Sequence, residues 1–429
     1  MPRSTPGSPS GEGSGRSAIP LLSVGHGCVD VYQGAVAALV PFFVAERAYS
    51  YAAASGLVLA ASLLSSVAQP LFGALTDRRA LPWLLPAGTL LGGLGIALSG
   101  LSPSYALTLL CVAVSGIGVA AYHPESARVA RRASRGRHSA MGWFSLGGNL
   151  GFAAAPLMVT AVVACGGLGY SPLFVLPAVL GGALYLPVAR ALRTFGRSAD
   201  GAAPHPGSDD DRRSFVRLSL VVVCRSVAFV GLSTFLSLYA QQRTGGGAAA
   251  GTAALFVLYL GGAVGTVLGG SLANRWGRVA VVRRAYLVTV AAVAGTVLVP
   301  GPLLYVCVAL TSAGLYVPFS LQVTLGQDYL PTRVGTASGV TLGLAVSVGG
   351  LAGPAIGALA DATSLRTALT PLIVMPALAW LLARTLPEPG RLRPARTRPR
   401  GGTTSRPPAA SPSPPAPPAP PAPPAPPAG

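Results

Sequence analysis

Residues 73–78 read Gly-Ala-Leu-Thr-Asp-Arg, and residues 270–275 read Gly-Ser-Leu-Ala-Asn-Arg, 197 positions further along the chain. A second pair of matching segments, Gly151–Pro156 and Gly349–Pro354, is separated by 198 positions. Two cysteines also recur at a spacing of 196 positions: Cys28 as Cys224, and Cys111 as Cys307. Because several features return at almost the same spacing, the sequence predicts two similar halves.

The composition is that of a membrane protein. Of the 429 residues, 51% are hydrophobic and only 10% are charged, and the mean hydropathy is +0.57. A soluble domain carries about 25% charged residues, so this chain has too few charges to cover a surface in water. Apolar runs recur that are long enough to cross ~30 Å of hydrocarbon, and we count about twelve of them. The predicted spans are 18–44, 52–75, 81–101, 105–123, 140–163, 173–192, 215–240, 250–273, 279–299, 303–325, 334–360 and 369–386.

The predicted spans form two groups of six. We predict a disordered N-terminus over 1–17, a first half over 18–194, a linker over 195–214, a second half over 215–386, and a disordered Pro- and Arg-rich tail over 387–429. Such a parallel repeat has a pseudo-two-fold axis along the membrane normal, and its substrate binds between the halves near the midplane. The predicted fold is an all-α membrane protein with twelve transmembrane helices.

The arginines predict the orientation in the membrane. All 31 Lys or Arg residues are Arg, the net charge is +19, and most of the arginines lie between spans or in the terminal segments. The connections after the odd-numbered spans hold only Arg47, Arg243 and Arg366. Basic residues are retained in the cytoplasm, so both termini and the linker are expected there, with the chain in the inner (plasma) membrane. No basic stripe with interleaved aromatic residues lies outside the spans, so we expect no nucleic-acid partner.

Asp30 and Arg225 each lie inside a predicted span. A charge at membrane depth costs at least ~2.5–3.5 kcal/mol, so it normally faces a partner or a water-filled path. His26 lies four residues before Asp30, on the same helix face, and Gln33 lies near that face. A carboxylate in a low-dielectric site can exchange protons near neutral pH. Asp30 and His26 are therefore candidates for proton coupling.

Two interpretations of Arg225 remain open. It could form a static ion pair with Asp30 that fixes the packing between the halves, because buried charges need partners. Alternatively, its planar guanidinium could hold the anionic group of a substrate.

Glu125 and His123 form a second candidate site near the end of the fourth span. Glu125 and Arg128 are three residues apart and can pair on one helix face. Pro124 is expected to kink or end the regular helix. The cluster could act as a proton relay at an inner gate, with Glu125 and His123 as its titrating groups, or it could be a salt bridge that holds the end of the span.

The repeated loop segment resembles the cytoplasmic loop signature of the major facilitator superfamily. The first copy supplies Gly73, Asp77 and Arg78, and the second supplies Gly270, Asn274 and Arg275. The resemblance implies that these residues gate the transport path. A glycine permits a tight turn between helices, and an aspartate at a helix end can pair with an arginine or cap a neighbouring helix.

A more specific resemblance lies in residues 121–131, Ala-Tyr-His-Pro-Glu-Ser-Ala-Arg-Val-Ala-Arg, and in Gly147-Gly-Asn-Leu-Gly151. These strings are similar to the fosmidomycin-resistance subfamily of drug exporters, and the similarity extends over most of residues 20–386. The resemblance implies an inner-membrane, proton-linked exporter of small toxic compounds. Tyr122 and Asn149 lie in these strings and are candidate substrate-binding residues, together with Arg225 and Gln33.

The sequence therefore predicts a secondary active transporter that exports a small drug-like or anionic compound against inward proton flow. Proton-coupled uptake of a small metabolite is the alternative within transport, and a non-transporting sensor on a transporter fold is the alternative of another class. We expect no enzymatic activity, because no nucleophile–base set is visible. We also expect no cofactor and no metal site, since the cysteines lack metal-ligand spacing. The expected partners are a small-molecule substrate, protons and the lipid bilayer, with the chain acting as a monomer.

Overall fold

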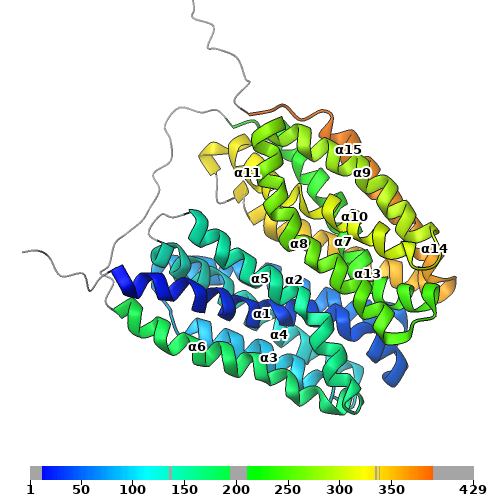
Figure 1. Cartoon of the computed structure of the whole chain (residues 1–429), viewed down its shortest axis with the longest axis horizontal. Coiled ribbons are helices and arrows are strands. Elements are labelled where there is room, and N and C mark those ends of the chain that lie inside the picture. The colour runs from blue at the N-terminus through cyan, green and yellow to red at the C-terminus, as the bar shows by residue number, and fades with distance from the viewer. Residues whose placement is uncertain (1–11, 135–137, 194–209, 334–335, 338, 390–429) are drawn as a thin grey trace, which may run out of the picture. The chain divides into compact units, whose positions relative to one another are not determined.

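The computed structural model describes residues 12–134, 138–193, 210–333, 336–337 and 339–389, and the regular structure within these ranges is helical, with no strand. In Figure 1, the helices of the first half lie together in blue to green, and those of the second half lie together in green to orange. The first half consists of α1 (Glu12–Arg47), α2 (Tyr51–Arg78), α3 (Leu84–Ser99), α4 (Tyr105–Ser134), α5 (His138–Ala164), the 3-10 helix η2 (Gly167–Val175) and α6 (Leu176–Arg193).

The second half is built in the same order with more interruptions. It consists of α7 (Arg212–Thr244), α8 (Gly247–Trp276), α9 (Arg278–Leu298), α10 (Leu303–Tyr316), α11 (Phe319–Tyr329), the 3-10 helix η3 (Pro331–Arg333), the π-helix η4 (Gly339–Leu344), α13 (Ala345–Ala362), α14 (Leu365–Leu369), the 3-10 helix η5 (Thr370–Ile373) and α15 (Val374–Ala383). Ten helical segments of the described chain are long and apolar enough to cross a membrane. The shorter apolar helix α3 and the continuous segment of η4 and α13 complete the twelve that the repeat predicts.

Several helix boundaries differ from the sequence prediction. Helix α1 begins at Glu12 and α7 begins at Arg212, inside segments that we predicted to be disordered or linker. Pro124 does not end its helix, because α4 continues to Ser134. The tenth span is interrupted instead at Pro318, between α10 and α11, where proline lacks the N–H that a continuous helix requires.

Helices α1 and α5 pack with their backbones in close contact. A Cβ atom on Gly151 would overlap the carbonyl oxygen of Gly27, and one on Gly148 would overlap Oδ2 of Asp30. Small residues allow helices to approach this closely in a membrane. The Gly147–Gly151 string therefore brings the α5 backbone against the face of α1 that presents Asp30.

The hydrogen bonds between the two halves of the described chain lie toward one end, which we call the closed end. There α2 packs against α13, and α5 packs against α8. Asp361 at the end of α13 accepts hydrogen bonds from the backbone N–H groups of Tyr51 (2.8 Å) and Ala52 (2.9 Å) at the start of α2. Between α5 and α8, the hydroxyl oxygens of Thr160 and Thr252 are 2.5 Å apart. The opposite end of the bundle is where α1 begins and α15 ends.

Asp361 forms an inter-half cap that must open whenever the closed end opens. The first N–H groups of a helix have no partner within the helix, and Asp361 supplies acceptors to two of them from the other half. Replacing Asp361 with Ala is expected to weaken the closed end by ~0.5–2 kcal/mol, the usual loss for a cap. A cysteine introduced at the buried Ser55 should then react faster with a membrane-impermeant maleimide.

The matched control for this prediction is Ser364→Ala. Ser364 caps α14 within the second half by accepting from the Thr367 N–H, so its loss removes a cap without touching the contact between halves. Equal reactivity of the cysteine in the Asp361→Ala and Ser364→Ala proteins would show that Asp361 does not hold the closed end.

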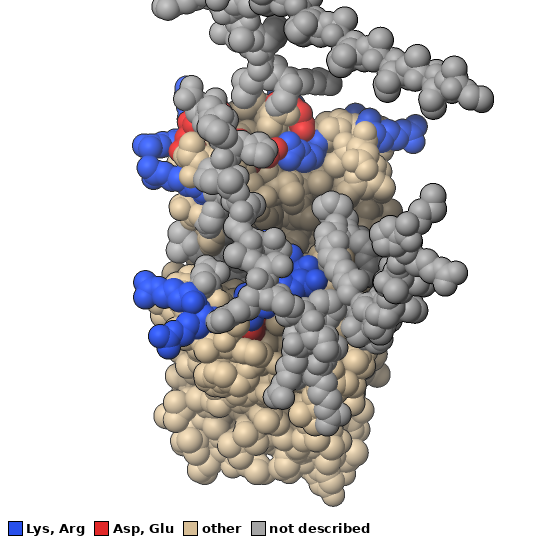
Figure 2. Space-filling view, turned by 90° about the vertical axis from the view of Figure 1, so that its left-hand side faces the viewer, with Lys and Arg blue, Asp and Glu red and all other residues tan. Residues whose placement is uncertain are grey.

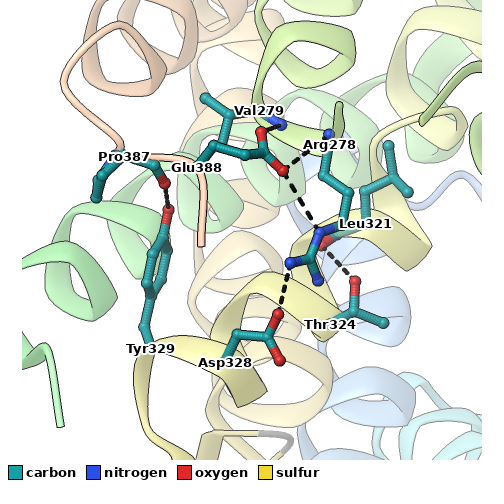
Figure 3. A network of polar contacts seen from close by, with 8 residues as sticks. All are labelled: Arg278, Val279, Leu321, Thr324, Asp328, Tyr329, Pro387 and Glu388. Atoms are coloured by element: carbon teal, nitrogen blue, oxygen red, sulfur yellow. Dashed lines mark hydrogen bonds and ion pairs between the residues drawn. The ribbon is translucent and has the colours of Figure 1, made fainter. Parts of the chain in front are cut away.

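Arginine and acidic side chains are visible on the face of the molecule at which α1 begins (Figure 2). The side chain of Arg278 lies 2.5 Å from Asp328 and 3.6 Å from Glu388 (Figure 3). Glu388 also accepts hydrogen bonds from the backbone N–H groups of Arg278 and Val279 at the start of α9, at 3.1 and 2.7 Å. Tyr329 donates to the carbonyl oxygen of Pro387 at 2.6 Å. Pro387 and Glu388 are therefore part of the folded second half, which corrects our placement of the tail boundary at residue 387.

The linker boundary is corrected by a similar contact. Asp210 accepts from the backbone N–H and the hydroxyl group of Thr332, at 3.2 and 2.7 Å. The hydrogen bond from the Thr332 hydroxyl holds the pKa of Asp210 below its usual range. Asp211 caps α7 by accepting from the Ser214 N–H. These residues belong to the second half, whereas residues 194–209 lie outside the described residues.

We predict that the C-terminal tail can be deleted only as far as Glu388. Residues 390–429 lie outside the described residues, and their Pro/Ala/Arg composition cannot form a packed core. Deleting residues 391–429 should leave membrane insertion and transport nearly unchanged. Deleting residues 387–429 should lower the unfolding free energy by ~1–2 kcal/mol, because it removes the cap of α9. Thermal unfolding in detergent measures the stability of both truncated proteins, and a transport assay measures their activity.

Equal stability of the two truncated proteins would contradict a structural role for Glu388. Loss of transport in the shorter deletion would show a regulatory role of the tail.

Candidate functional site

A cavity of about 320 Å³ lies between the two halves. Its wall includes residues of α1, α2, α4 and α5 from the first half, and residues of α7, α8, α10 and α11 from the second. Asp30 lies on the first wall and Arg225 on the second. The polar and uncharged residues of the lining are Gln33, Ser62, Ser65, Ser66, Gln69, Ser115, Asn149, Ser226 and Ser233. The cavity therefore presents one acidic and one basic side chain from opposite halves.

Asp30 is held between two histidines. Nε2 of His26 lies 3.3 Å from one carboxylate oxygen of Asp30, and Nε2 of His123 lies 3.0 Å from the other. We call His26, Asp30 and His123 the buried triad. His26 comes from the same helix, one turn earlier, and His123 comes from α4. All three side chains are mostly buried.

The hydrogen bonds of the two imidazole rings fix where their protons lie. Nδ1 of His26 lies 3.0 Å from the carbonyl oxygen of Phe144, and Nδ1 of His123 lies 2.8 Å from that of Val119. A carbonyl oxygen only accepts, so we assign a proton to each Nδ1. Each Nε2 then faces a carboxylate oxygen, and a hydrogen bond there requires another proton.

The triad can therefore carry either of two charges that differ by one proton. With a proton in both contacts to Asp30, the triad carries one net positive charge; with a proton in only one, it is neutral. Ionisable groups inside a membrane are usually functional. An ordinary histidine titrates near neutral pH, so proton exchange at this triad is chemically possible.

The same residues could also hold a metal ion. Donor atoms from the three side chains of the triad lie within 4.8 Å of one another, although the sequence predicted no metal site. The His123–Asp30 distance of 3.0 Å is a hydrogen-bond length and the His26–Asp30 distance of 3.3 Å is slightly longer. The geometry is therefore also compatible with protons in place of a metal ion.

Neighbouring aromatic rings hold His26 in place. The ring of Phe144 stacks on it with centroids 4.3 Å apart and an angle of 14° between the planes. The centre of the Tyr122 ring lies 6.2 Å from that of the His26 ring. Tyr122 is buried and does not line the cavity, so the structure gives it a packing contact with His26 instead of the substrate contact that we predicted.

Arg225 is buried and has no ion pair with an acidic side chain of the described chain. It is only 4% exposed, and its Nε has no hydrogen-bond partner. Its guanidinium carbon lies 4.9 Å from the centre of the Phe319 ring. The predicted alternative of an Asp30–Arg225 ion pair is therefore incorrect, because the carboxylate of Asp30 faces the two histidines. A buried and unpaired guanidinium at a cavity wall is able to bind an anion.

The remaining predicted residues fall into separate groups. Gln33 and Asn149 line the cavity. Glu125 is fully buried, and Arg128 donates to it from Nε at 2.9 Å. Glu125 is not part of the triad, so the structure supports the salt-bridge interpretation for this residue, and only His123 of that cluster contacts Asp30.

The residues of the two loop copies lie at the ends of α2 and α8. Gly73 and Gly270 are inside these helices, and a Cβ atom on either would meet nothing within 4 Å. The predicted tight turn at these glycines is therefore absent. Arg78, Asn274 and Arg275 are exposed, and Arg275 lies 5.9 Å from the ring of Trp276. The side chain of Asp77 lies outside the part of the chain that the structure describes.

Residues 22–354 match the Major Facilitator Superfamily. The chain belongs to the major facilitator superfamily. It is a multi-pass membrane transporter and not an enzyme.

Two bacterial relatives match most of the chain. The Fosmidomycin resistance protein of Escherichia coli (strain K12) is 29% identical over 369 residues, which covers 84% of this chain and 90% of that protein. The uncharacterized MFS-type transporter YfnC of Bacillus subtilis (strain 168) is 30% identical over 386 residues, which covers 87% of this chain and 93% of that protein.

Solved superfamily structures share the fold. A bacterial homologue of the human lysosomal transporter Spinster, in an inward-facing and unoccupied conformation, has a TM-score of 0.70 at 18% identity, covering 89% of this chain and 98% of that one. A mutant form of the nucleoside transporter NupG has a TM-score of 0.70 at 11% identity, covering 86% of this chain and 99% of that one. At these identities the likeness establishes the fold alone.

Sequence reasoning did not assign the aromatic residues of the cavity. Phe152, Phe229 and Phe319 line it, as do Tyr259 and Tyr316. Single aromatic residues are common in membrane helices, so their type alone did not mark them as cavity residues. The spacing of Arg225 and Phe229, one helical turn apart, was the available signal.

Proposed function

We propose that this superfamily member is a proton-coupled exporter of small anionic compounds. The observation that supports this most directly is the buried triad, in which two histidines contact Asp30 at the wall of the central cavity. The unpaired Arg225 on the facing wall supports an anionic substrate. The 29% identity to a protein named for fosmidomycin resistance favours export.

In this mechanism the cavity is reached alternately from the two sides of the membrane. The distribution of arginines suggests that the end at which α1 begins is cytoplasmic. With the opposite, closed end held by Asp361, the described state then corresponds to a cavity that faces the cytoplasm. An anion binds at Arg225 while a proton leaves the triad to the cytoplasm. The halves then rock, the anion is released outside, and the triad takes up another proton there.

The anion and the proton are carried in turn. The halves rock either with the anion bound and the triad's proton released, or without the anion and with the proton on the triad. The binding of one ligand must therefore lower the affinity for the other. Both walls come from one chain, so we propose that the monomer is the functional unit.

A susceptibility screen tests this proposal. Cells with and without the protein are challenged with anionic, neutral and cationic growth inhibitors, including fosmidomycin. The proposal predicts that the inhibitory concentration rises for anionic compounds and that the Asp30→Asn protein gives no protection. Increased sensitivity to the same compounds would instead indicate uptake, and protection against cations alone would contradict an anion site at Arg225.

A further inference from the structure

A partly exposed aromatic surface lies beside Arg225. It consists of Phe229, Tyr259, Tyr316 and Phe319, which we call the aromatic wall, and all four residues line the cavity. Phe229 follows Arg225 by one turn of α7. Its ring meets that of Tyr316 edge-on, with centroids 5.4 Å apart and an angle of 78°. The wall therefore continues directly from the guanidinium.

The aromatic wall is available to a ligand. Phe229, Tyr316 and Phe319 are only partly buried, although they face the interior of the protein between the two halves. Tyr259 is buried behind them, and its ring centre lies 6.3 Å from that of Phe229. A ring inserted into the cavity could therefore make edge-to-face contacts with several of these side chains, which is the arrangement that aromatic groups prefer.

Arg225 provides a second, independent observation that points to a ligand. Its Nε has no hydrogen-bond partner among the described residues, although only 4% of the residue is exposed. Phe319 covers one side of the guanidinium at 4.9 Å. Stacking on a ring leaves the N–H groups at the edge of the guanidinium free to donate to a carboxylate or phosphonate. The charge and the ring surface thus adjoin within one cavity.

We infer that the cavity selects small aromatic anions, in which one carboxylate, phosphonate or sulfonate group is attached to a single ring. The anionic group lies at Arg225 and the ring lies against the aromatic wall. Since a cavity of about 150 Å³ is enough to hold benzene, the volume of about 320 Å³ accommodates a ring together with its anionic group. This inference rests on the proposed role of Arg225 as the anion receptor, but it does not depend on proton coupling.

Calorimetric binding to the purified full chain in detergent, without a proton gradient, tests the inference. Three probes separate the contribution of the aromatic ring to binding from that of the charge: phenylphosphonate, cyclohexylphosphonate and benzylamine. Phenylphosphonate is expected to bind roughly 2- to 10-fold more tightly than cyclohexylphosphonate, the preference that aromatic contacts supply beyond buried area. Benzylamine should not bind measurably, because its charge repels that of Arg225.

The variant Phe229→Leu keeps an apolar side chain and removes the ring beside Arg225. It should lower the preference for phenylphosphonate over cyclohexylphosphonate toward one, because both ligands then meet an aliphatic side chain at this position. The matched control is Phe256→Leu, a partly buried phenylalanine of α8 that does not line the cavity, and it should keep the wild-type preference.

Three outcomes overturn the inference: equal affinity for the two phosphonates, no binding of either, or an unchanged preference in Phe229→Leu. Because the measurement involves no gradient, it separates this inference from the proposed function. Binding of phenylphosphonate without proton-coupled transport would leave the aromatic-anion site standing and reject the coupling.

Discussion

Replacing Asp30 with Asn is expected to abolish uphill transport while the protein still folds and reaches the membrane. Asparagine has nearly the shape of aspartate, so the packing against His26, His123 and Gly148 is kept. It cannot carry the negative charge that holds two protonated imidazoles, so the triad loses its exchangeable proton. Accumulation against a gradient should fall to the level of membranes without the protein, whereas exchange of substrate between the two sides should persist.

The control for Asp30→Asn is Glu46→Gln on the same helix. Glu46 lies near the closed end and accepts from the Leu168 N–H at 2.9 Å, so it tests the general effect of removing an acid from α1. Gradient-driven transport in everted vesicles and exchange in the same vesicles are the two measurements. Normal uphill transport by the Asp30→Asn protein would exclude Asp30 as the proton carrier.

Replacing Arg225 with Gln is expected to remove the anion site without destabilising the protein. Hydrogen bonds to a charged group are worth about 1.5–3 kcal/mol, so the affinity for anionic compounds should fall roughly 10- to 150-fold. Neutral compounds should bind as before. Arg225→Lys should be intermediate, because an ammonium group keeps the charge and loses the planar fork.

Thermal stability distinguishes an Arg225 that faces the cavity from an Arg225 that is paired with Asp30. If Arg225 were paired with Asp30, its removal would leave a lone buried charge and cost ~3–5 kcal/mol, which Asp30→Asn would restore in the double variant. Since Asp30 contacts the two histidines instead, we expect Arg225→Gln to be at least as stable as the wild type, with no rescue by the second change. A large loss of stability that the double variant recovers would contradict the geometry.

The repeat made the fold predictable from the sequence, because twelve apolar runs and a spacing of almost 200 positions leave few alternatives for a membrane chain. The pairing of His26 with Asp30 was also predictable, since residues four apart share a helix face. His123 was identified as a titratable residue, but its contact with Asp30 could not be predicted. That contact depends on how α4 crosses α1, which no local spacing encodes.

The errors have a common physical origin. Asp30 and Arg225 were the most prominent opposite charges at similar depth, and the need to pair buried charges suggested that they meet. The two histidines pair with Asp30 instead, and Arg225 lines the cavity. Pro387 and Glu388 were assigned to the tail from composition, yet one carboxylate at the N-terminus of α9 fixes them to the folded part.

The most direct test of the central claim is substrate-driven proton movement in everted vesicles, with a pH-sensitive dye and a compound identified by the susceptibility screen. A proton-coupled exporter would carry substrate into the lumen of such vesicles, so the proposed function predicts that adding the anion makes the acidic lumen more alkaline as substrate enters and protons leave. The response should survive a metal chelator and be absent with Asp30→Asn. Acidification of the lumen, or substrate entry with no proton movement, would contradict proton-coupled export.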